Sequence, residues 1–498
     1  MKPLTCAVVG LLAMVQIAAA KTPSPVGRKV ENFSLKDFRG TEHALSDAAK
    51  SKLVVIAFLG TECPVAKQYG PRLAELAKEY QPRGVTFLGI NANRQDSLTE
   101  IAAYARDSEI KFPILKDLGN VVADRLGAVR TPEVFVLDED RVVRYWGRID
   151  DRLGVGYARQ KPASHYLQDA IDRLLEGQAV EPQSVESVGC HIGRVRAPRA
   201  DSQLTYSNQI ARIFQNRCVQ CHRPGEIAPF ALTDYSEVAG WADTIAEVVR
   251  ERRMPPWHAS REYGRFKNDA SLSDVEQDQI LQWAAAGAPE GDPKDLPEPR
   301  RFVEGWTLPW QPDMVVNIQQ QPFNVPANGE LRYQFFTVDP GFTEDKWIRA
   351  SQIVPGESSV VHHVLCFVQP KDGNRREFDE NGLGFLSAYV PGYRAAPFPD
   401  GMAKYVLAGS KLVFQMHYTP TGKPVQDLSR IGFVFARPAE LTHMIQTVST
   451  ANRGIEIPSR KGDYRAEATM PAYKNDLQEL VVIRFQIREQ ADFFDQFG

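Results

Sequence analysis

The chain has 498 residues, of which 43% are hydrophobic and 24% are charged, and its formal net charge is −3 at pH 7. This length exceeds one ordinary domain, and at roughly 100 to 200 residues per domain it predicts about three units. No basic stripe interleaved with aromatic residues occurs in the sequence, which argues against nucleic acid as a partner.

The N-terminus is a predicted signal peptide. Lys2 precedes an apolar run at residues 7–20, which ends in small residues at Ala18 and Ala20. The run is shorter than the roughly 20 apolar residues of a membrane span, and its pattern is typical of a secretory leader, residues 1–20, cleaved after Ala20. We therefore expect an exported protein, in a compartment such as the bacterial periplasm, with no membrane span in the mature chain. Five of six cysteines remain after cleavage, and an odd number argues against a pure disulfide framework.

The first unit is expected at residues 26–183. A fully apolar run at residues 52–60 predicts a buried strand, and the residues that follow it have helical spacing. Cys63 is therefore expected where this strand meets a helix, a place where the helix N-terminus stabilises a thiolate. Further strands are expected at 85–92, 131–138 and 141–149, and further helices at 97–108 and 163–177.

This β-α-β-α-β-β-α order resembles the thioredoxin-like fold in its redoxin branch, of the AhpC/TSA type. The resemblance implies that Cys63 is the catalytic thiol and that Pro132 is a cis-proline facing it. The chain departs from the Cys-x-x-Cys of disulfide oxidoreductases, because residues 63–66 read CPVA, and Thr61 lies too close to Cys63 for the peroxiredoxin pattern. Three interpretations stay open: a peroxidatic thiol, a thiol paired with Cys190, or an inert thiol on a redoxin scaffold.

The second unit begins after residues 184–203, which mix Gly, Pro and charge without periodicity and predict a linker. Residues 204–298 contain Cys218, Cys221 and His222 in a CVQCH sequence. Two thiols on one helical turn can bind the two vinyl groups of one haem, and the next residue supplies an imidazole to the iron, so this pattern indicates c-type haem attachment. A zinc site and a redox dithiol are the alternative interpretations.

The remainder of this unit resembles the cytochrome c family. Met254 lies in a Met-Pro sequence, and residues 272–289 predict an amphipathic helix capped by Ser273. An attachment helix, a Met-Pro loop and a closing helix follow one another in the order of that all-α family. The resemblance implies one covalent haem c with His222 and Met254 as axial ligands, which favours ferrous iron and suits electron transfer. His258 is the competing ligand.

The sequence pattern of the third unit, residues 301–440, is typical of an antiparallel β-sandwich. Short β-rich runs are found at 331–338, 346–354, 359–368, 411–420 and 430–437. His362, His363 and His417 lie within these apolar runs, where a polar ring needs a partner, and three imidazoles suit copper or zinc. Successive strand residues point to opposite faces. His362 and His363 can therefore reach one ion only if the strand bends or bulges there, or if the rings use different nitrogens.

The stretches PGESSVVHHVLCFV and GSKLVFQMHYTP look like the first copper module of the ascorbate-dependent type II copper monooxygenases. The resemblance implies that His362, His363 and His417 bind the copper that delivers electrons. The His-x-His pair of the family's hydroxylating copper is missing, and no histidine follows His443. Residues 441–498 are too few for a second sandwich and are expected to be a remnant. Either the hydroxylating half was lost or the chain is truncated.

Together these patterns predict an exported, multidomain oxidoreductase or electron-transfer protein with a haem, one copper ion and a redoxin thiol. One alternative is an ascorbate-type copper monooxygenase completed by another chain. Another is a thiol peroxidase-like antioxidant with an accessory haem domain. A third is a metal-handling or scaffold protein whose redoxin domain is inert.

Overall fold

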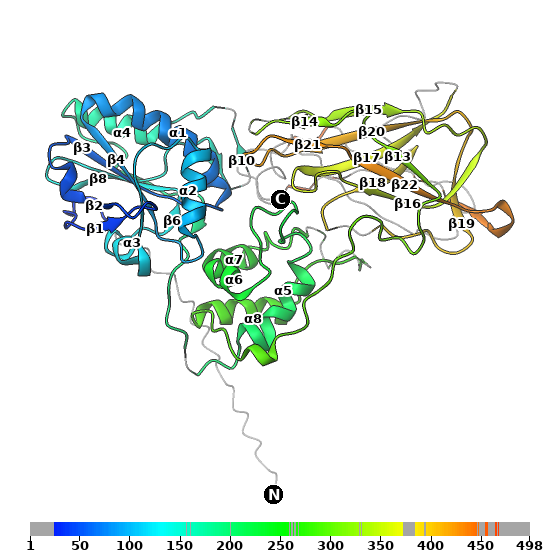
Figure 1. Ribbon diagram of the computed structural model, residues 1–498, viewed down its shortest axis with the longest axis horizontal. Coiled ribbons are helices and arrows are strands. Elements are labelled where there is room, and N and C mark those ends of the chain that lie inside the picture. Colours follow the sequence, from blue (N-terminus) through cyan, green and yellow to red (C-terminus); the bar gives the residue numbers. More distant parts are fainter. Residues whose placement is uncertain are drawn as a thin grey trace, which may run out of the picture.

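A computed structural model describes the larger part of the chain, which forms three lobes that follow one another in sequence (Figure 1). The described residues are 24–445 without 156, 160, 200, 258, 260, 261, 263, 264, 267, 328, 330, 372–383, 393 and 394, together with 447, 454–456, 464, 465 and 467. The expected leader with its cleavage site at Ala20, the competing ligand His258 and most of residues 441–498 lie outside this set. Within it, no helix has the length and apolar character needed to cross a membrane.

The first lobe is built on a six-stranded mixed sheet with the order β11-β8-β7-β3-β4-β5. Strand β3 is buried along its whole length, because helices cover both faces of the sheet, and it pairs in parallel with β4 and antiparallel with β7. The strands are β3 (Leu53–Phe58), β4 (Val85–Asn91), β5 (Ile114–Lys116), β7 (Glu133–Leu137), β8 (Val143–Gly147) and β11 (Ser184–Val185). The helices are α1 (Pro64–Tyr80), α2 (Leu98–Asp107), α3 (Val121–Leu126) and α4 (Tyr166–Leu175).

Short elements complete this lobe. They are β1 (Ser34–Lys36), β2 (Glu42–Ala44), β6 (Arg130–Thr131), β9 (Leu153–Gly154), β10 (Tyr157–Ala158) and β12 (Cys190–His191), with 3-10 turns at Leu45–Ala48, Gln81–Arg83 and Leu118–Asn120. The predicted strands and helices of this unit are all present. Strand β5 and helix α3 were not anticipated, because elements of three and six residues are too short to show a periodic pattern.

The prediction that residues 184–203 form a linker is wrong. Strand β11 adds a parallel edge to the six-stranded sheet beside β8, and β12 pairs antiparallel with β6. Strands of two residues carry no sequence period, and the contacts that hold them are made by residues far away in the chain, so the local sequence does not show them. Residues 184–195 therefore belong to the first lobe, whereas Arg196 and Arg199 bind Asp243 and Ala286 of the second.

The second lobe is helical. Among its described residues between 204 and 298 there are helices and no strand: a π-helical turn (Tyr206–Ile210), α5 (Ala211–Arg217), α6 (Tyr235–Gly240), α7 (Ala242–Arg250), α8 (Asp274–Ala285) and a 3-10 turn (Pro293–Asp295). Ser273 caps α8, as predicted, and its Oγ accepts from the backbone N of Glu276. One contiguous apolar cluster runs from β3 and α1 through Cys190 to α7 and α8. The first two lobes therefore share a core.

The third lobe is a two-layered β structure. Its sheets have the orders β13-β22-β16-β19-β23 and β15-β20-β17-β18, with a separate β14-β21 pair, and residues from both sheets form one core. The strands are β13 (Met314–Asn317), β14 (Phe323–Val325), β15 (Gln334–Val338), β16 (Lys346–Val354), β17 (Val361–Gln369), β18 (Phe385–Tyr389), β19 (Met402–Val406), β20 (Lys411–Tyr418), β21 (Val425–Asp427), β22 (Arg430–Phe435) and β23 (His443–Met444). Strand β23 pairs with β19, so the unit extends beyond the expected boundary at residue 440.

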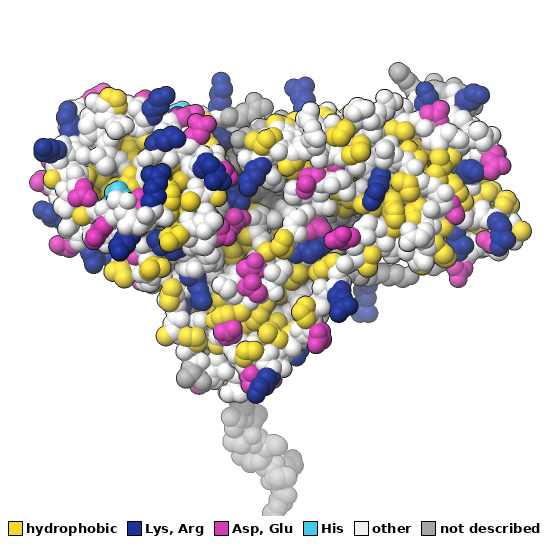
Figure 2. Space-filling view, viewed as in Figure 1, with side chains coloured by type: hydrophobic (Ala, Val, Ile, Leu, Met, Phe, Trp, Pro, Cys, Tyr) yellow, Lys and Arg dark blue, Asp and Glu magenta, His cyan; other side chains and the backbone are white. Residues whose placement is uncertain are grey.

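On the face that Figure 2 shows, the surface of all three lobes is mixed in charge. On the face shown in Figure 2, basic and acidic side chains are interspersed over the whole molecule. This distribution agrees with the composition, in which 59 basic residues are balanced by 62 acidic ones. On this face a single-sign field of the kind that attracts nucleic acid does not form.

Candidate redox and metal centres

Cys63 is positioned by the junction of β3 and α1. It is the N-cap residue of α1 and is followed by Pro64 in the first turn, a position that favours proline because no intrahelical N–H is needed there. The side chain is fully buried. Its Sγ donates a hydrogen bond to the backbone oxygen of Thr131 at 3.0 Å, and the Thr131–Pro132 peptide bond is cis. The thiol therefore faces the proline loop that the sequence singled out.

Cys190 reaches the same place from the segment that follows the domain. Strand β12 pairs antiparallel with β6, and this register sets Cys190 opposite Thr131 and His191 opposite Arg130. The Cys190 thiol hydrogen-bonds to the Cys63 sulfur, and both cysteines are buried and free. The second thiol that is missing from the helix is thus present beside Cys63, supplied by a different element.

The two thiols have different acidities. Burial alone raises the pKa of Cys63, but hydrogen bonds from the Cys190 thiol and from the backbone of Ala66 and Cys190 outweigh it and lower the pKa to about 7. The pKa of Cys190 is raised well above its usual value, first by its hydrogen bond to Cys63 and then by burial. Because the thiolate is the nucleophilic form, Cys63 is the sulfur of the pair that is suited to attack, and Cys190 is the one that stays protonated.

The segment that carries Cys190, residues 189–193, is here named the strap. Its backbone is bound to the first lobe at several points. Ile192 N donates to Val129 O at 2.9 Å, Gly193 N donates to Asn93 Oδ1 at 3.0 Å, and Arg130 Nη1 donates to Gly189 O at 2.8 Å. The strap is therefore an ordered part of the thiol site.

The CVQCH sequence forms a helical turn at the end of α5. The backbone N groups of Cys221 and His222 donate to Cys218 O at 3.1 and 3.0 Å, which sets the two thiols on one turn. His222 Nδ1 donates to Phe230 O at 3.1 Å. This bond leaves the lone pair on Nε2, the arrangement found in metal-bound histidines. Burial lowers the pKa of His222 to about 4, so the ring is neutral near pH 7. These three residues fit the attachment of a c-type haem.

Met254 lies apart from this turn in sequence. It is half-buried in the loop that follows α7, and its backbone N donates to Val248 O at 3.2 Å. Its assignment as an axial ligand stays a prediction.

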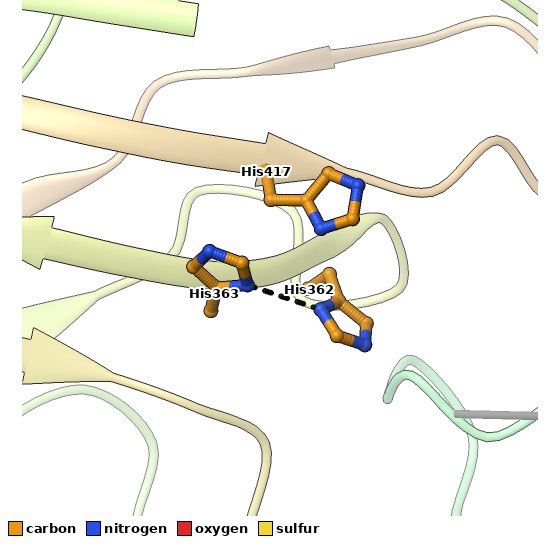
Figure 3. A group of neighbouring side chains, drawn as sticks. All are labelled: His362, His363 and His417. Atoms are coloured by element: carbon orange, nitrogen blue, oxygen red, sulfur yellow. Dashed lines mark hydrogen bonds between the residues drawn. The ribbon is translucent and has the colours of Figure 1, made fainter. Parts of the chain in front are cut away.

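The three histidines of the third lobe lie together at one end of the four-stranded sheet. Each offers a ring nitrogen, and these atoms all lie within 4.8 Å of one another. Figure 3 shows a nitrogen of every ring turned into the space between the rings. His362 Nδ1 and His363 Nδ1 are 3.2 Å apart, which is close to the ~3.3 Å expected between two ligands of a tetrahedral ion with bonds of about 2.0–2.1 Å. The trio fits a copper or zinc ion.

A β-bulge explains how two adjacent histidines share this site. The ladder between β17 and β20 pairs Val361 with Tyr418 and His363 with His417, so its register shifts between Val361 and His363. His362 is the extra residue. A bulge turns a side chain away from strict alternation, which is the local distortion that a shared ion required. The ring of Tyr333, which the sequence did not single out, packs against His363 and His417 at centroid distances of 5.6 and 5.1 Å.

The second and third lobes meet beside the CVQCH turn. A Cβ on Gly392 would lie 3.2 Å from Cys221 Sγ. Burial, and then the charges of Glu226 and Cys221, raise the pKa of the Tyr389 hydroxyl. Tyr389 ends β18 and pairs with Val364, the neighbour of His363. The CVQCH turn therefore lies against the end of β18 and the residues after it, in the sheet that carries the three histidines.

Comparison with known proteins assigns the first lobe. The AhpC/TSA family profile matches residues 26–146. Thioredoxin-like protein YneN of Bacillus subtilis is 31% identical over 119 residues, which make up 24% of this chain and 68% of YneN. The chain belongs to the AhpC/TSA family. Thiol-disulfide oxidoreductase ResA of Bacillus cereus is 27% identical over 165 residues, or 33% of this chain and 88% of ResA. A structurally known hypothetical protein of Sinorhizobium meliloti is 30% identical, with a TM-score of 0.33, and the match covers 34% of this chain and 96% of that protein.

The AhpC/TSA domain occupies about the first third of the chain, and the matches above lie within it. It is an α/β thioredoxin-like domain, as predicted. The second thiol of the pair lies outside the family match, because Cys190 is 44 positions beyond its last residue, Trp146. The sequence signal for Cys190 was the absence of a second cysteine from the helix of Cys63. Nothing in the sequence pointed to Glu247 of α7, which contacts the strap.

Proposed function

We propose that this chain is an exported thiol-disulfide oxidoreductase whose redox pair is Cys63 and Cys190. One observation carries the proposal: the β6–β12 register sets Cys190 beside the cis-proline loop and against the Cys63 sulfur. The names of the relatives support it, since ResA is a thiol-disulfide oxidoreductase. The predicted leader supports an oxidising compartment, where such exchange takes place.

The proposed reaction transfers two electrons by disulfide exchange. The Cys63 thiolate attacks one sulfur of a substrate disulfide, so that a mixed disulfide forms and the other substrate sulfur leaves as a thiolate. Cys190 then gives up its proton and attacks Cys63. The second substrate sulfur leaves and the Cys63–Cys190 disulfide forms. The substrate gains two electrons and the cysteine pair loses two; Cys190 releases one proton, and the second proton that the substrate thiols take up comes from solvent, which received it when Cys63 ionised. The reaction runs in either direction according to the two reduction potentials.

Redox titration of the purified full chain tests this proposal. In glutathione buffers of graded potential, peptide mapping should find a Cys63–Cys190 disulfide that appears in one two-electron step. The Cys190→Ala variant should instead accumulate a Cys63–glutathione mixed disulfide. A wild-type pair that stays reduced in every buffer would exclude the proposed chemistry.

We further propose that the second and third lobes carry one covalent haem c and one copper ion for one-electron transfer. The contact of Cys221 with the Tyr389–Gly392 stretch supports this second role, because it joins the two candidate centres. Haem with a histidine ligand would supply a one-electron iron couple. Copper held by three imidazoles would supply a second one-electron couple. In the protein itself, the Phe230 carbonyl orients His222, and the bulge at His362 brings the three rings together.

Reduction of the haem, followed by copper EPR, tests electron exchange between these centres. A copper signal that does not respond to the haem state would exclude the relay. Ascorbate-driven oxygen uptake in the presence of a second chain would instead favour the copper monooxygenase alternative. Reduction of peroxide at Cys63 would favour the thiol peroxidase alternative.

A further inference from the structure

A carboxylate of the second lobe is bound to the strap beside Cys190. Glu247, on α7, accepts from His191 Nε2 at 2.6 Å and from Arg130 Nη2 at 2.7 Å, both through Oε2. Its other oxygen, Oε1, accepts from Arg253 Nη2 at 2.7 Å. The side chains of Glu247, His191 and Arg130 are only 19, 24 and 20% exposed. Charge-assisted hydrogen bonds in such a partly desolvated site are stronger than those at the surface.

The two residues that Glu247 binds form one half of the ladder that positions the thiols. Strands β6 and β12 consist of two residue pairs, Cys190 with Thr131 and His191 with Arg130. Glu247 bridges the second pair, and the thiol site is built on the first. Helix α7 makes one more bond to this pair, because His191 N donates to Thr244 Oγ1 at 2.9 Å.

A ladder of two residues is too short to be stable on its own, so its register depends on contacts from outside. The Arg130 guanidinium links both sides, since Nη1 donates to Gly189 O while Nη2 donates to Glu247. Burial alone raises the pKa of Glu247, but the hydrogen bonds from His191 and Arg130 outweigh it and lower the pKa to about 2. The carboxylate is therefore ionised over the whole range in which the thiols react.

We infer that Glu247 is a positioning residue for the Cys63–Cys190 pair, and that the second lobe thereby completes the redox centre of the first. This inference rests on the proposed thiol exchange. The hydrogen bonds of Glu247 go to His191, Arg130 and Arg253, and its charge is the least of the causes of the raised pKa of Cys190. Glu247 keeps Cys190 at attacking distance by holding His191 and Arg130 in register. Loss of this constraint lowers the effective concentration of Cys190 at Cys63, which weakens the intramolecular disulfide.

The test compares full-length Glu247→Gln with wild type. The amide keeps the size of the side chain, but it has one oxygen and an NH2 group, so it cannot accept at both of the positions that the Glu247 carboxylate uses. We expect the equilibrium constant for Cys63–Cys190 disulfide formation to fall about tenfold, which is ~30 mV for a two-electron couple. Resolution of the Cys63 mixed disulfide should slow by a similar factor, while the initial attack by Cys63 keeps its rate. Glu251→Gln is the matched control, because Glu251 also binds Arg253, through Nε at 2.7 Å, and should leave both quantities unchanged.

A second arm separates this inference from the proposed function. In a Cys63→Ser background no disulfide between Cys63 and Cys190 can form, and adding Glu247→Gln should raise the alkylation rate of Cys190 about tenfold as the strap loosens. His191→Gln should shift the same rate in the same direction by less, and it serves if Glu247→Gln does not fold. An unchanged alkylation rate and an unchanged potential would overturn the positioning role. A wild-type pair that never oxidises, together with a raised alkylation rate, would overturn the thiol exchange while supporting the role of Glu247.

Discussion

His363 faces His417 directly across the β17–β20 ladder, with the two ring centroids 5.1 Å apart. Three imidazoles converge here only because the bulge adds His362 to this cross-strand pair. The ring nitrogens of these three residues lie within 4.8 Å of one another without a bound ion, which is the arrangement that a copper or zinc ion needs. The constraint comes from the backbone register, so the site should respond sharply to loss of any one ring.

Replacing His363 with alanine should reduce copper affinity by more than about tenfold, because loss of a ligand costs at least as much as loss of an outer-shell partner. Metal analysis after dialysis against a copper chelator measures the loss. His443→Ala is the matched control, since His443 is an exposed histidine on β23 of the same lobe. Copper retained by the His363→Ala and His362→Ala variants alike would refute the assignment.

Haem attachment should depend on the CVQCH turn alone. Cys218→Ala combined with Cys221→Ala should abolish covalent haem, because no thioether bonds can then form. A pyridine haemochrome spectrum of the denatured protein measures the covalently bound haem. Cys366→Ala, in a buried cysteine of the third lobe, should keep the wild-type haem content. Equal haem content in the double variant and in the control would contradict the prediction.

Alkylation of Cys63 should follow a titration with a midpoint near pH 7, because the pKa of Cys63 is lowered to about 7. Because the thiolate reacts, the alkylation rate rises with pH through this midpoint and levels off above it. Cys190→Ala removes the hydrogen bond that stabilises the thiolate, and the midpoint should move upward by about one pH unit or more. A small neutral reagent and mass spectrometry of the Cys63 peptide give the profile. The opposite direction of shift in Cys190→Ala would show that Cys190 does not stabilise the thiolate.

Gly189 should tolerate no side chain. Its φ is +144°, and a Cβ there would lie 2.1 Å from the Thr131 carbonyl oxygen, so Gly189→Ala must push the strap off the cis-proline loop. We expect a loss of more than about 1 kcal/mol in the free energy of unfolding, and faster alkylation of Cys190. Gly177→Ala is the control, because φ is +72° there but no atom lies within 4 Å of the added Cβ. It should show the backbone cost of roughly 1 kcal/mol without the change at Cys190, and similar alkylation in both variants would count against the strap contact.

Local spacing in the sequence determined the reactive groups of this protein. A buried apolar run followed by a helical pattern set Cys63 at a helix start, and the CVQCH spacing set two thiols and an imidazole on one turn. The same kind of pattern marked the strands that carry His362, His363 and His417. These features depend on residues within a few positions of one another, whose geometry the backbone period dictates.

Only the tertiary structure decided which groups meet. Cys190 reaches Cys63 through a ladder of two residue pairs, and Glu247 binds Arg130 across a separation of 117 residues. The bulge at His362 likewise depends on the strand opposite. Elements this short have no period of their own, and a long-range hydrogen bond leaves no local trace in the sequence. The residues of the candidate centres could therefore be predicted from the sequence. Their partners, and the packing of the first lobe against the second, depend on the tertiary structure.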